Sequence, residues 1–257
     1  MNQVFVRFYE ELNDFLPRSR QKIDSQVLSK GRQSVKDMIE ALGVPHTEVD
    51  LILVHGKSVK FEHILQDGDR ISVYPVFESL DIRDVTHLRE IPLRKTRFIA
   101  DINIGNIVKY MRALGLDVYF DPGLSPREII GISKQAQRII LTKSRKLLKY
   151  RQVSHGIFIR HGRTIEQIKR IIDLLSLRAH IHPFSRCLTC NTPLVQVAKQ
   201  QVEDRIPPKV RIWCEEYACC EHCSKVYWKG SHFTRIKEVL DEILGPGSWE
   251  QERSFFP

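Results

Sequence analysis

Two short apolar runs decide the fold of this chain: Phe98-Ile-Ala-Asp101 and, further on, Ile139-Ile-Leu-Thr142-Lys-Ser144-Arg145. Continuous apolar runs of this length are typical of strands that are buried on both faces of a parallel sheet. Ligands of such sheets bind beyond the carboxyl ends of the strands. We therefore expect Asp101 and Ser144, which follow the two runs, to lie at one edge of one sheet.

Helix-forming segments alternate with these strands. Ser125, with Pro126 next to it and Glu128 three positions on, is typical of a helix N-terminus. The expected order is a strand at 97–100, a helix at 104–114, a strand at 118–120, a helix from Pro126, strands at 139–141 and 156–159, and a helix from its cap Thr164 to about Leu177. Strands that alternate with helices in this way predict a parallel α/β sheet.

Two cysteine pairs, Cys187-Leu-Thr-Cys190 and Cys220-Glu-His-Cys223, have the spacing of zinc knuckles. Four thiolates on one Zn²⁺ form a closed, structural site. Disulfides are the alternative, but a chain that we take as intracellular favours metal. Cys214 and Cys219 are additional; Cys219 could replace Cys220, although the resulting C-x₃-C spacing fits less well.

The residues around these knuckles predict a ribbon. Segments 194–198 and 209–213 read as two strands on either side of a turn at Pro207-Pro208. The aromatic and basic run 227–232 could stack on a base, and packing against the ribbon is the alternative. A closing helix is expected at 233–244, followed by a tail to Pro257.

The first eighty residues predict a separate domain. Residues 4–9 alternate as a strand, and another strand-like piece lies near 22–28. Ser34 and Asp37 have the spacing of a capping box before a short helix that ends at Gly43. Two further strands follow at 50–55 and 68–77. The order β-β-α-β-β is that of a β-grasp domain.

The net charge of +9 is concentrated in one window of the sequence. Residues 131–170 contain eleven Lys or Arg and one acid, Glu166, which gives +10. Such a block is either a solvated face or a footprint for a phosphate backbone. No apolar run approaches the roughly 20 residues of a membrane helix, so we expect a soluble, cytoplasmic protein with no membrane partner.

Two sets of motifs resemble known families. The segment from 98 contains Phe98-Ile-Ala-Asp101, Gly105, Arg112-Ala-Leu-Gly115, Asp121, Glu128, Arg138-Ile-Ile-Leu-Thr142 and Arg145-Lys-Leu-Leu148. This series resembles the PIN-like RNase domain at the C-terminus of mutator-type exonucleases, which also occurs in stand-alone PilT-like prokaryotic proteins. Leu53-Val-His-Gly56 and the run 67–78 resemble the ubiquitin-like, sulfur-carrier type of domain that precedes it. The segment lacks a carrier's C-terminal Gly-Gly, so docking to protein or RNA, or a purely structural role, is expected instead.

The resemblance implies RNA phosphodiester hydrolysis with Mg²⁺ or Mn²⁺ held by clustered carboxylates. Asp101 matches the first family carboxylate and Glu128 the helix carboxylate, and Asp121 is what remains of an acidic cluster. Ser144 stands at the position of the third carboxylate. Each has an alternative: a strand-end cap for Asp101, a capping box with Ser125 for Glu128, and a turn for Asp121.

Basic residues near these positions are the expected RNA phosphate contacts: Lys109, Arg112, Lys143, Arg145, Lys146 and Lys149. For Arg112 the alternative is that its stem covers apolar surface. Because the third carboxylate is missing, an RNA-binding or protein-interaction module without efficient cleavage is the rival to an active ribonuclease.

The predicted architecture is therefore an α+β domain, an α/β domain and a zinc ribbon in series. The predicted bounds are 1–80 for the ubiquitin-like β-grasp domain, 81–96 for a linker, 97–182 for the PIN-like domain, 183–233 for the ribbon, and 234–257 for the C-terminal helix and tail. RNA is the expected partner, and a protein partner is expected for the β-grasp domain. The sequence predicts no oligomeric state.

Overall fold

The structure is a computed structural model that describes residues 2–29, 31–75 and 96–247. The predicted linker at 81–96, apart from its last residue, and the predicted tail from 248 lie outside these residues. The chain divides into two compact units, the first formed by 1–95 with 126–158 and the second by 96–125 with 159–257. Each unit is described by itself. No described helix is both long and apolar enough to cross a membrane.

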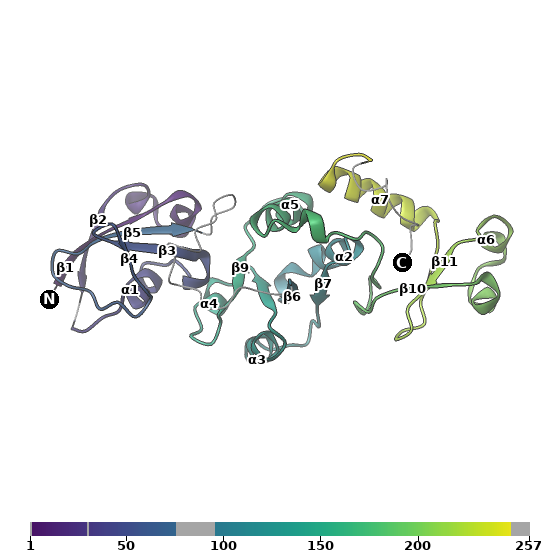
Figure 1. The fold of residues 1–257 in the computed structure, drawn as a ribbon, viewed down its shortest axis with the longest axis horizontal. Coiled ribbons are helices and arrows are strands. Elements are labelled where there is room, and N and C mark those ends of the chain that lie inside the picture. The colour runs from purple at the N-terminus through teal and green to yellow at the C-terminus, as the bar shows by residue number, and fades with distance from the viewer. Residues whose placement is uncertain (1, 30, 76–95, 248–257) are drawn as a thin grey trace. The chain divides into compact units, whose positions relative to one another are not determined.

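The first unit contains the predicted β-grasp domain (Figure 1). Its five-stranded sheet has the order β2-β1-β5-β3-β4, with β1 and β5 parallel and the other pairs antiparallel. The elements are β1 (Asn2–Phe8), η1 (Glu10–Phe15), η2 (Arg18–Arg20), β2 (Ser25–Ser29), α1 (Val35–Ala41), η3 (His46–Glu48), β3 (Val49–Val54), β4 (Lys57–Ser58) and β5 (Arg70–Pro75). The predicted fold class of this domain is confirmed.

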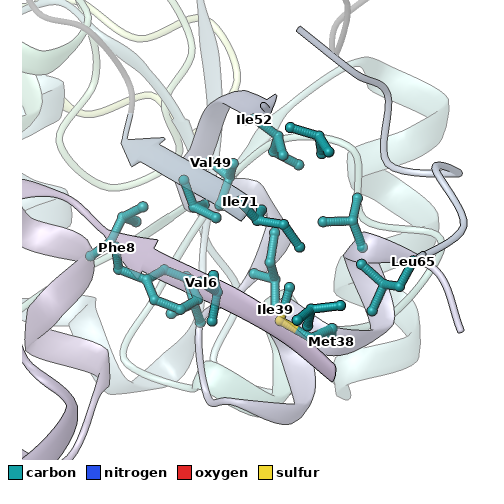
Figure 2. Packing of buried hydrophobic residues seen from close by; sticks show 14 of the residues in the cluster. Val6, Phe8, Met38, Ile39, Val49, Ile52, Leu65 and Ile71 are labelled. Carbon is teal, nitrogen blue, oxygen red and sulfur yellow. The ribbon is translucent and has the colours of Figure 1, made fainter. Parts of the chain in front are cut away.

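Local signals explain how helix α1 forms on this sheet. Ser34 Oγ accepts from the Asp37 N–H at 3.1 Å, and the Asp37 carboxylate accepts from the Ser34 N–H at 3.4 Å, which is the predicted capping box. The buried face of α1 presents Met38 and Ile39, which Figure 2 shows gathered with Val6 of β1 among the core residues. Burial of these side chains holds the helix on the sheet.

Two parallel strand pairs form the α/β part of the chain. In the second unit β6 (Arg97–Ala100) pairs with β7 (Asp117–Tyr119), and in the first unit β8 (Ile139–Thr142) pairs with β9 (Gly156–Phe158). The helical elements are η4 (Ile102–Ile104), α2 (Gly105–Ala113), α3 (Pro126–Ala136), α4 (Arg145–Leu148), α5 (Thr164–Leu174) and η5 (Leu177–His180). Parallel pairing with alternating helices confirms the predicted parallel α/β class.

Helix α5 begins and ends differently from the prediction. Its N-cap is Arg163 rather than Thr164, because the Glu166 carboxylate accepts from the Arg163 N–H at 3.2 Å. The Thr164 hydroxyl instead accepts from the Asn106 side chain of α2 at 2.8 Å. The helix ends at Leu174, three residues before the predicted end, and a short 3-10 turn follows.

The ribbon in the second unit has three short antiparallel strands in the order β10-β11-β12. They are β10 (Val195–Val197), β11 (Tyr217–Cys219) and β12 (Val226–Tyr227), with η6 (Lys199–Gln201), η7 (Glu203–Arg205), α6 (Pro208–Trp213) and the closing α7 (Ser231–Leu244). The strand predicted at 209–213 is wrong, because this segment is helix α6. Pro208 at the first helical position sets φ for a helix, and β11 provides the second strand.

Candidate functional site

Four cysteines of the second unit come together as the sequence predicted. The sulfur atoms of Cys187, Cys190, Cys220 and Cys223 all lie within 4.8 Å of one another. The Sγ atoms of Cys187 and Cys223 are 3.5 Å apart, and those of Cys190 and Cys220 are 3.3 Å apart. A zinc ion about 2.3 Å from each of four sulfurs requires separations of about 3.8 Å in a tetrahedron. The donor set and its spacing therefore fit a closed zinc site, and all six cysteines are free of disulfides.

The surroundings of the cluster shift the pKa values of its thiols. Burial raises the pKa of the Cys190 thiol, but hydrogen bonds with Thr192 outweigh it and lower that pKa to about 5. Burial raises the pKa of Cys223 to about 12. Tyr227 Oη lies 3.2 Å from Cys187 Sγ and accepts from the Leu188 N–H at 3.1 Å. Four thiols this close together cannot all ionise without a neighbouring cation, which a bound metal supplies.

Arg112 supports this cluster rather than a nucleic acid. Its guanidinium donates to the Val118 carbonyl from two nitrogens, at 3.0 and 2.9 Å, and to the carbonyls of Leu188 and Thr189 at 3.1 and 2.6 Å. The residue is 4% exposed. Burial lowers its pKa, and the nearby thiols of Cys187 and Cys190 oppose that shift. The Arg112 guanidinium thus bonds to the first knuckle and to β7, which differs from the phosphate contact expected from the sequence.

Two predicted acidic residues follow the strands of the second unit. Asp101 comes directly after β6, is 7% exposed, and accepts from the Asn103 amide at 3.1 Å. Its backbone carbonyl also accepts from the Ile104 N–H, which starts the turn before α2. Asp121 uses its carboxylate in a turn, where it accepts from the Gly123 N–H at 2.8 Å. The turn interpretation of Asp121 therefore has direct support.

Glu128 and Ser144 belong to the first unit. Glu128 lies in the first turn of α3, two residues after its start at Pro126. Ser144 is the N-cap of α4, where its hydroxyl accepts from the Leu147 N–H at 3.2 Å. Within the described part of either unit, no carboxylates gather into a group of three potential metal ligands.

Arg145 and Lys149, two of the predicted phosphate contacts, bond to the ubiquitin-like domain instead. Arg145 donates to the carbonyls of Phe15 and Asp14 at 3.1 and 3.2 Å, and its guanidinium lies 4.8 Å from the centre of the Phe15 ring. Lys149 Nζ donates to the Glu40 carbonyl at 2.6 Å. The β-grasp domain is thereby attached to α4, the helix that Ser144 caps. Sequence spacing gave no signal for this contact.

Further contacts fix the same attachment. The Phe158 N–H donates to the Glu48 carboxylate at 2.6 Å, and the rings of Phe158 and Phe15 meet edge to face at 5.2 Å. The buried His46 ring lies 2.8 Å from the Val153 carbonyl. Lys143 and Lys146, the other predicted contacts in this unit, make no bond to the ubiquitin-like domain among the residues that the structure describes.

Comparisons with known families cover nearly the whole chain. A family model described as Mut7-C RNAse domain matches residues 96–240, and one described as Mut7-C ubiquitin matches residues 1–81. Neither a curated protein nor a solved structure matches the chain. The match over 96–240 spans both strand pairs and the four cysteines, and it indicates a nuclease-type function. The chain therefore belongs to the Mut7-C RNAse domain family, with the ubiquitin-like domain of that family over residues 1–81.

Proposed function

We propose that the chain is a divalent-metal-dependent ribonuclease whose site is weakened at position 144. The observation that carries this proposal is the buried carboxylate of Asp101 at the carboxyl end of a parallel strand, where ligands of such sheets bind. The family match to an RNase domain supports RNA as the substrate.

The resemblance to PIN-like RNase domains makes Asp101 and Glu128 the proposed ligands of the ion, and carboxylate oxygens are what Mg²⁺ and Mn²⁺ prefer. A bound ion would activate a water molecule and stabilise charge on the phosphodiester oxygens. Within the chain, the Asn103 amide orients the Asp101 carboxylate through its hydrogen bond. Lys143 and Lys146 supply positive charge for the RNA backbone.

A second candidate function is RNA binding without efficient cleavage. Ser144 favours it, because a hydroxyl that accepts from the Leu147 N–H brings no negative charge to a metal. Two carboxylates hold a divalent ion more weakly than three, and the flanking Lys143 and Arg145 repel it further. Both functions require RNA binding, and they differ in whether the bound RNA is cleaved.

Cleavage of labelled single-stranded RNA with Mn²⁺ or Mg²⁺ tests the proposal. Asp101→Asn should reduce metal-dependent cleavage at least about 100-fold, which corresponds to the loss of about 3 kcal/mol of transition-state stabilisation. Asp121→Asn is the matched control, since an asparagine oxygen can keep the bond to the Gly123 N–H. Equal cleavage by the wild type and Asp101→Asn would refute the site, and RNA binding without cleavage by either would favour the second candidate.

The ubiquitin-like domain is proposed to dock to protein. In this chain it already contacts α4 through Arg145 and Lys149, so its first partner is its own nuclease segment. Its strand β2 is an edge of the sheet and exposes Leu28, which is 60% accessible. An edge strand of this kind can pair with an added strand of another chain.

A further inference from the structure

A cavity of about 520 Å³ lies within the second unit, between the zinc knuckles and the start of α7. Its walls come from α2, the first knuckle, β12 and the first turn of α7. The volume falls in the range of roughly 300–1,000 Å³ that is usual for sites of small organic groups. A base with its sugar and phosphate is a group of this kind.

Four aromatic residues line the cavity: Phe184, Tyr227, Trp228 and Phe233. Phe184 and Phe233 stack with their ring centres 4.3 Å apart, and both line the space. Tyr227 is held by the bonds of its hydroxyl at the first knuckle, while Trp228 packs against the ribbon core. Because these contacts already restrict the rings, a base that stacks on one of them orders it at little further entropic cost. Every nucleobase has a π-face, so such rings accept a base whatever the sequence.

Basic side chains also line the cavity, and one of them, Arg186, already lies 4.0 Å from the Asp117 carboxylate. Lys109, Arg186 and Lys225 line it, and none of the lining residues, all within the described part of the second unit, is acidic. Lys225 Nζ donates to the Thr189 hydroxyl at 2.8 Å. Among the residues described by the structure, neither Lys109 nor Lys225 has a carboxylate within ion-pair distance. Both ammonium groups therefore remain able to meet an anion.

The first turn of α7 adds to this charge. Gly230 is the N-cap and provides no side-chain bond to the helix, and Gly230 and Ser231 both line the cavity. The N-terminus of a helix carries about half a positive charge. It thus reinforces the lysines, which on their own already define a site for an anionic group.

We propose that this cavity binds one nucleotide of single-stranded RNA, with the base against the aromatic rings and the phosphate at Lys109 and Lys225. The inference rests on the proposed function and names a binding position for the substrate beside the zinc site. It also gives the zinc knuckles a role, because they fix Tyr227 and the Leu188–Thr189 wall in place. A peptide with acidic and aromatic residues is the competing occupant, and the aromatic surface favours RNA.

The test uses the full zinc-loaded chain and a short single-stranded RNA that contains iodouridine. Photocrosslinks should map to Phe233, Tyr227 or Trp228. Phe233→Leu keeps an apolar contact with Phe184 and removes one aromatic face, and it should weaken binding in fluorescence anisotropy by roughly 5- to 150-fold. Lys109→Gln and Lys225→Gln should each weaken RNA binding. Each should also lower the number of counterions released on binding, measured from the salt dependence of the affinity, by about one. The control is Lys57→Gln, an exposed lysine of β4, which should bind as the wild type does.

Zinc content and thermal unfolding of each variant separate lost binding from lost folding. Crosslinks that map to 134–170, together with unchanged binding by Lys109→Gln and Lys225→Gln, would refute the cavity as the nucleotide site. The proposal that the chain binds RNA would not be affected. Complete failure of the wild type to bind or cleave RNA would overturn both the cavity and the proposed function. An acidic aromatic peptide that binds more tightly than RNA and displaces it would assign the cavity to protein and overturn the RNA proposal.

Discussion

Replacement of the buried Arg112 by methionine should destabilise the second unit and loosen its zinc site. The wild-type guanidinium makes four hydrogen bonds to the three carbonyls of Val118, Leu188 and Thr189. Methionine has a similar length and restores none of them. Arg112→Met therefore tests whether this residue supports the knuckle, as the structure shows, or contacts RNA, as its position in the sequence suggested.

The expected size of the effect follows from burial. Arg112 is 4% exposed. Without it, the Val118 carbonyl loses its donors in a buried place, and the carbonyls of Leu188 and Thr189 lose theirs in a partly buried one. Each costs about 1–3 kcal/mol when unsatisfied, and breaking a buried charged network costs about 3–5 kcal/mol in total because such losses do not add. A loss of that size lowers the melting temperature by roughly 6–20 °C in a unit of this length.

Two assays measure the change. Denaturant unfolding of the zinc-loaded protein gives the free energy of unfolding, and the rate of zinc transfer to a chromogenic chelator reports on the site. Zinc affinity should fall about 10- to 100-fold, as expected when a group that orients metal ligands is removed. Lys109→Met, an exposed change three residues earlier on the same helix, should leave the unfolding free energy within about 0.5 kcal/mol of the wild type.

An unfolding free energy and a zinc transfer rate equal to those of the wild type would refute this role for Arg112. Weaker RNA binding at unchanged stability would instead restore the phosphate contact that the sequence predicted.

Three other changes have defined outcomes. Arg145→Leu should weaken the attachment of the ubiquitin-like domain to α4 by about 1.5–3 kcal/mol without abolishing it, because the contacts of Lys149, Glu48 and His46 remain; faster amide exchange around Phe15 should report it, whereas the exposed neighbour Lys146→Leu should have no such effect. Gly115→Ala should prevent stable folding of the second unit, because φ is +83° and the added carbon would lie 2.2 Å from the His182 carbonyl oxygen; soluble yield and melting temperature measure this. Cys187→Ser should abolish zinc binding in native mass spectrometry, and lowering the pH should release zinc from the wild type, because protons compete with the metal for thiolates; zinc retained by Cys187→Ser would count against the four-sulfur site.

Short-range patterns predicted most of the fold. The capping box of Ser34 and Asp37, the strand alternation and the two cysteine pairs each involve residues close in sequence, and the structure contains all of them. Segment 209–213 was mistaken for a strand because Val210, Ile212 and Trp213 have high β propensity. Pro208 at the first helical position outweighed that preference.

The roles of the basic residues could not be predicted in the same way. Arg112 bonds to carbonyls 76 and 77 residues further along the chain, and Arg145 bonds to carbonyls 130 and 131 residues earlier. A count of charges in a window contains no information on such partners. For the same reason the sequence could not show that Lys109 and Lys225 line one cavity.

The most direct test of the proposed function compares Ser144→Asp with Ser144→Asn in metal-dependent RNA cleavage. Both aspartate and asparagine cap a helix about as well as serine, so both variants keep the N-cap of α4. They differ in one carboxylate. If the site is a ribonuclease site that lacks its third acid, Ser144→Asp should cleave RNA faster than the wild type with Mn²⁺ and need less metal, and Ser144→Asn should not. If both variants fold and bind RNA but cleave it at equal rates, position 144 is not the place of a missing metal ligand, and the proposed ribonuclease site is contradicted.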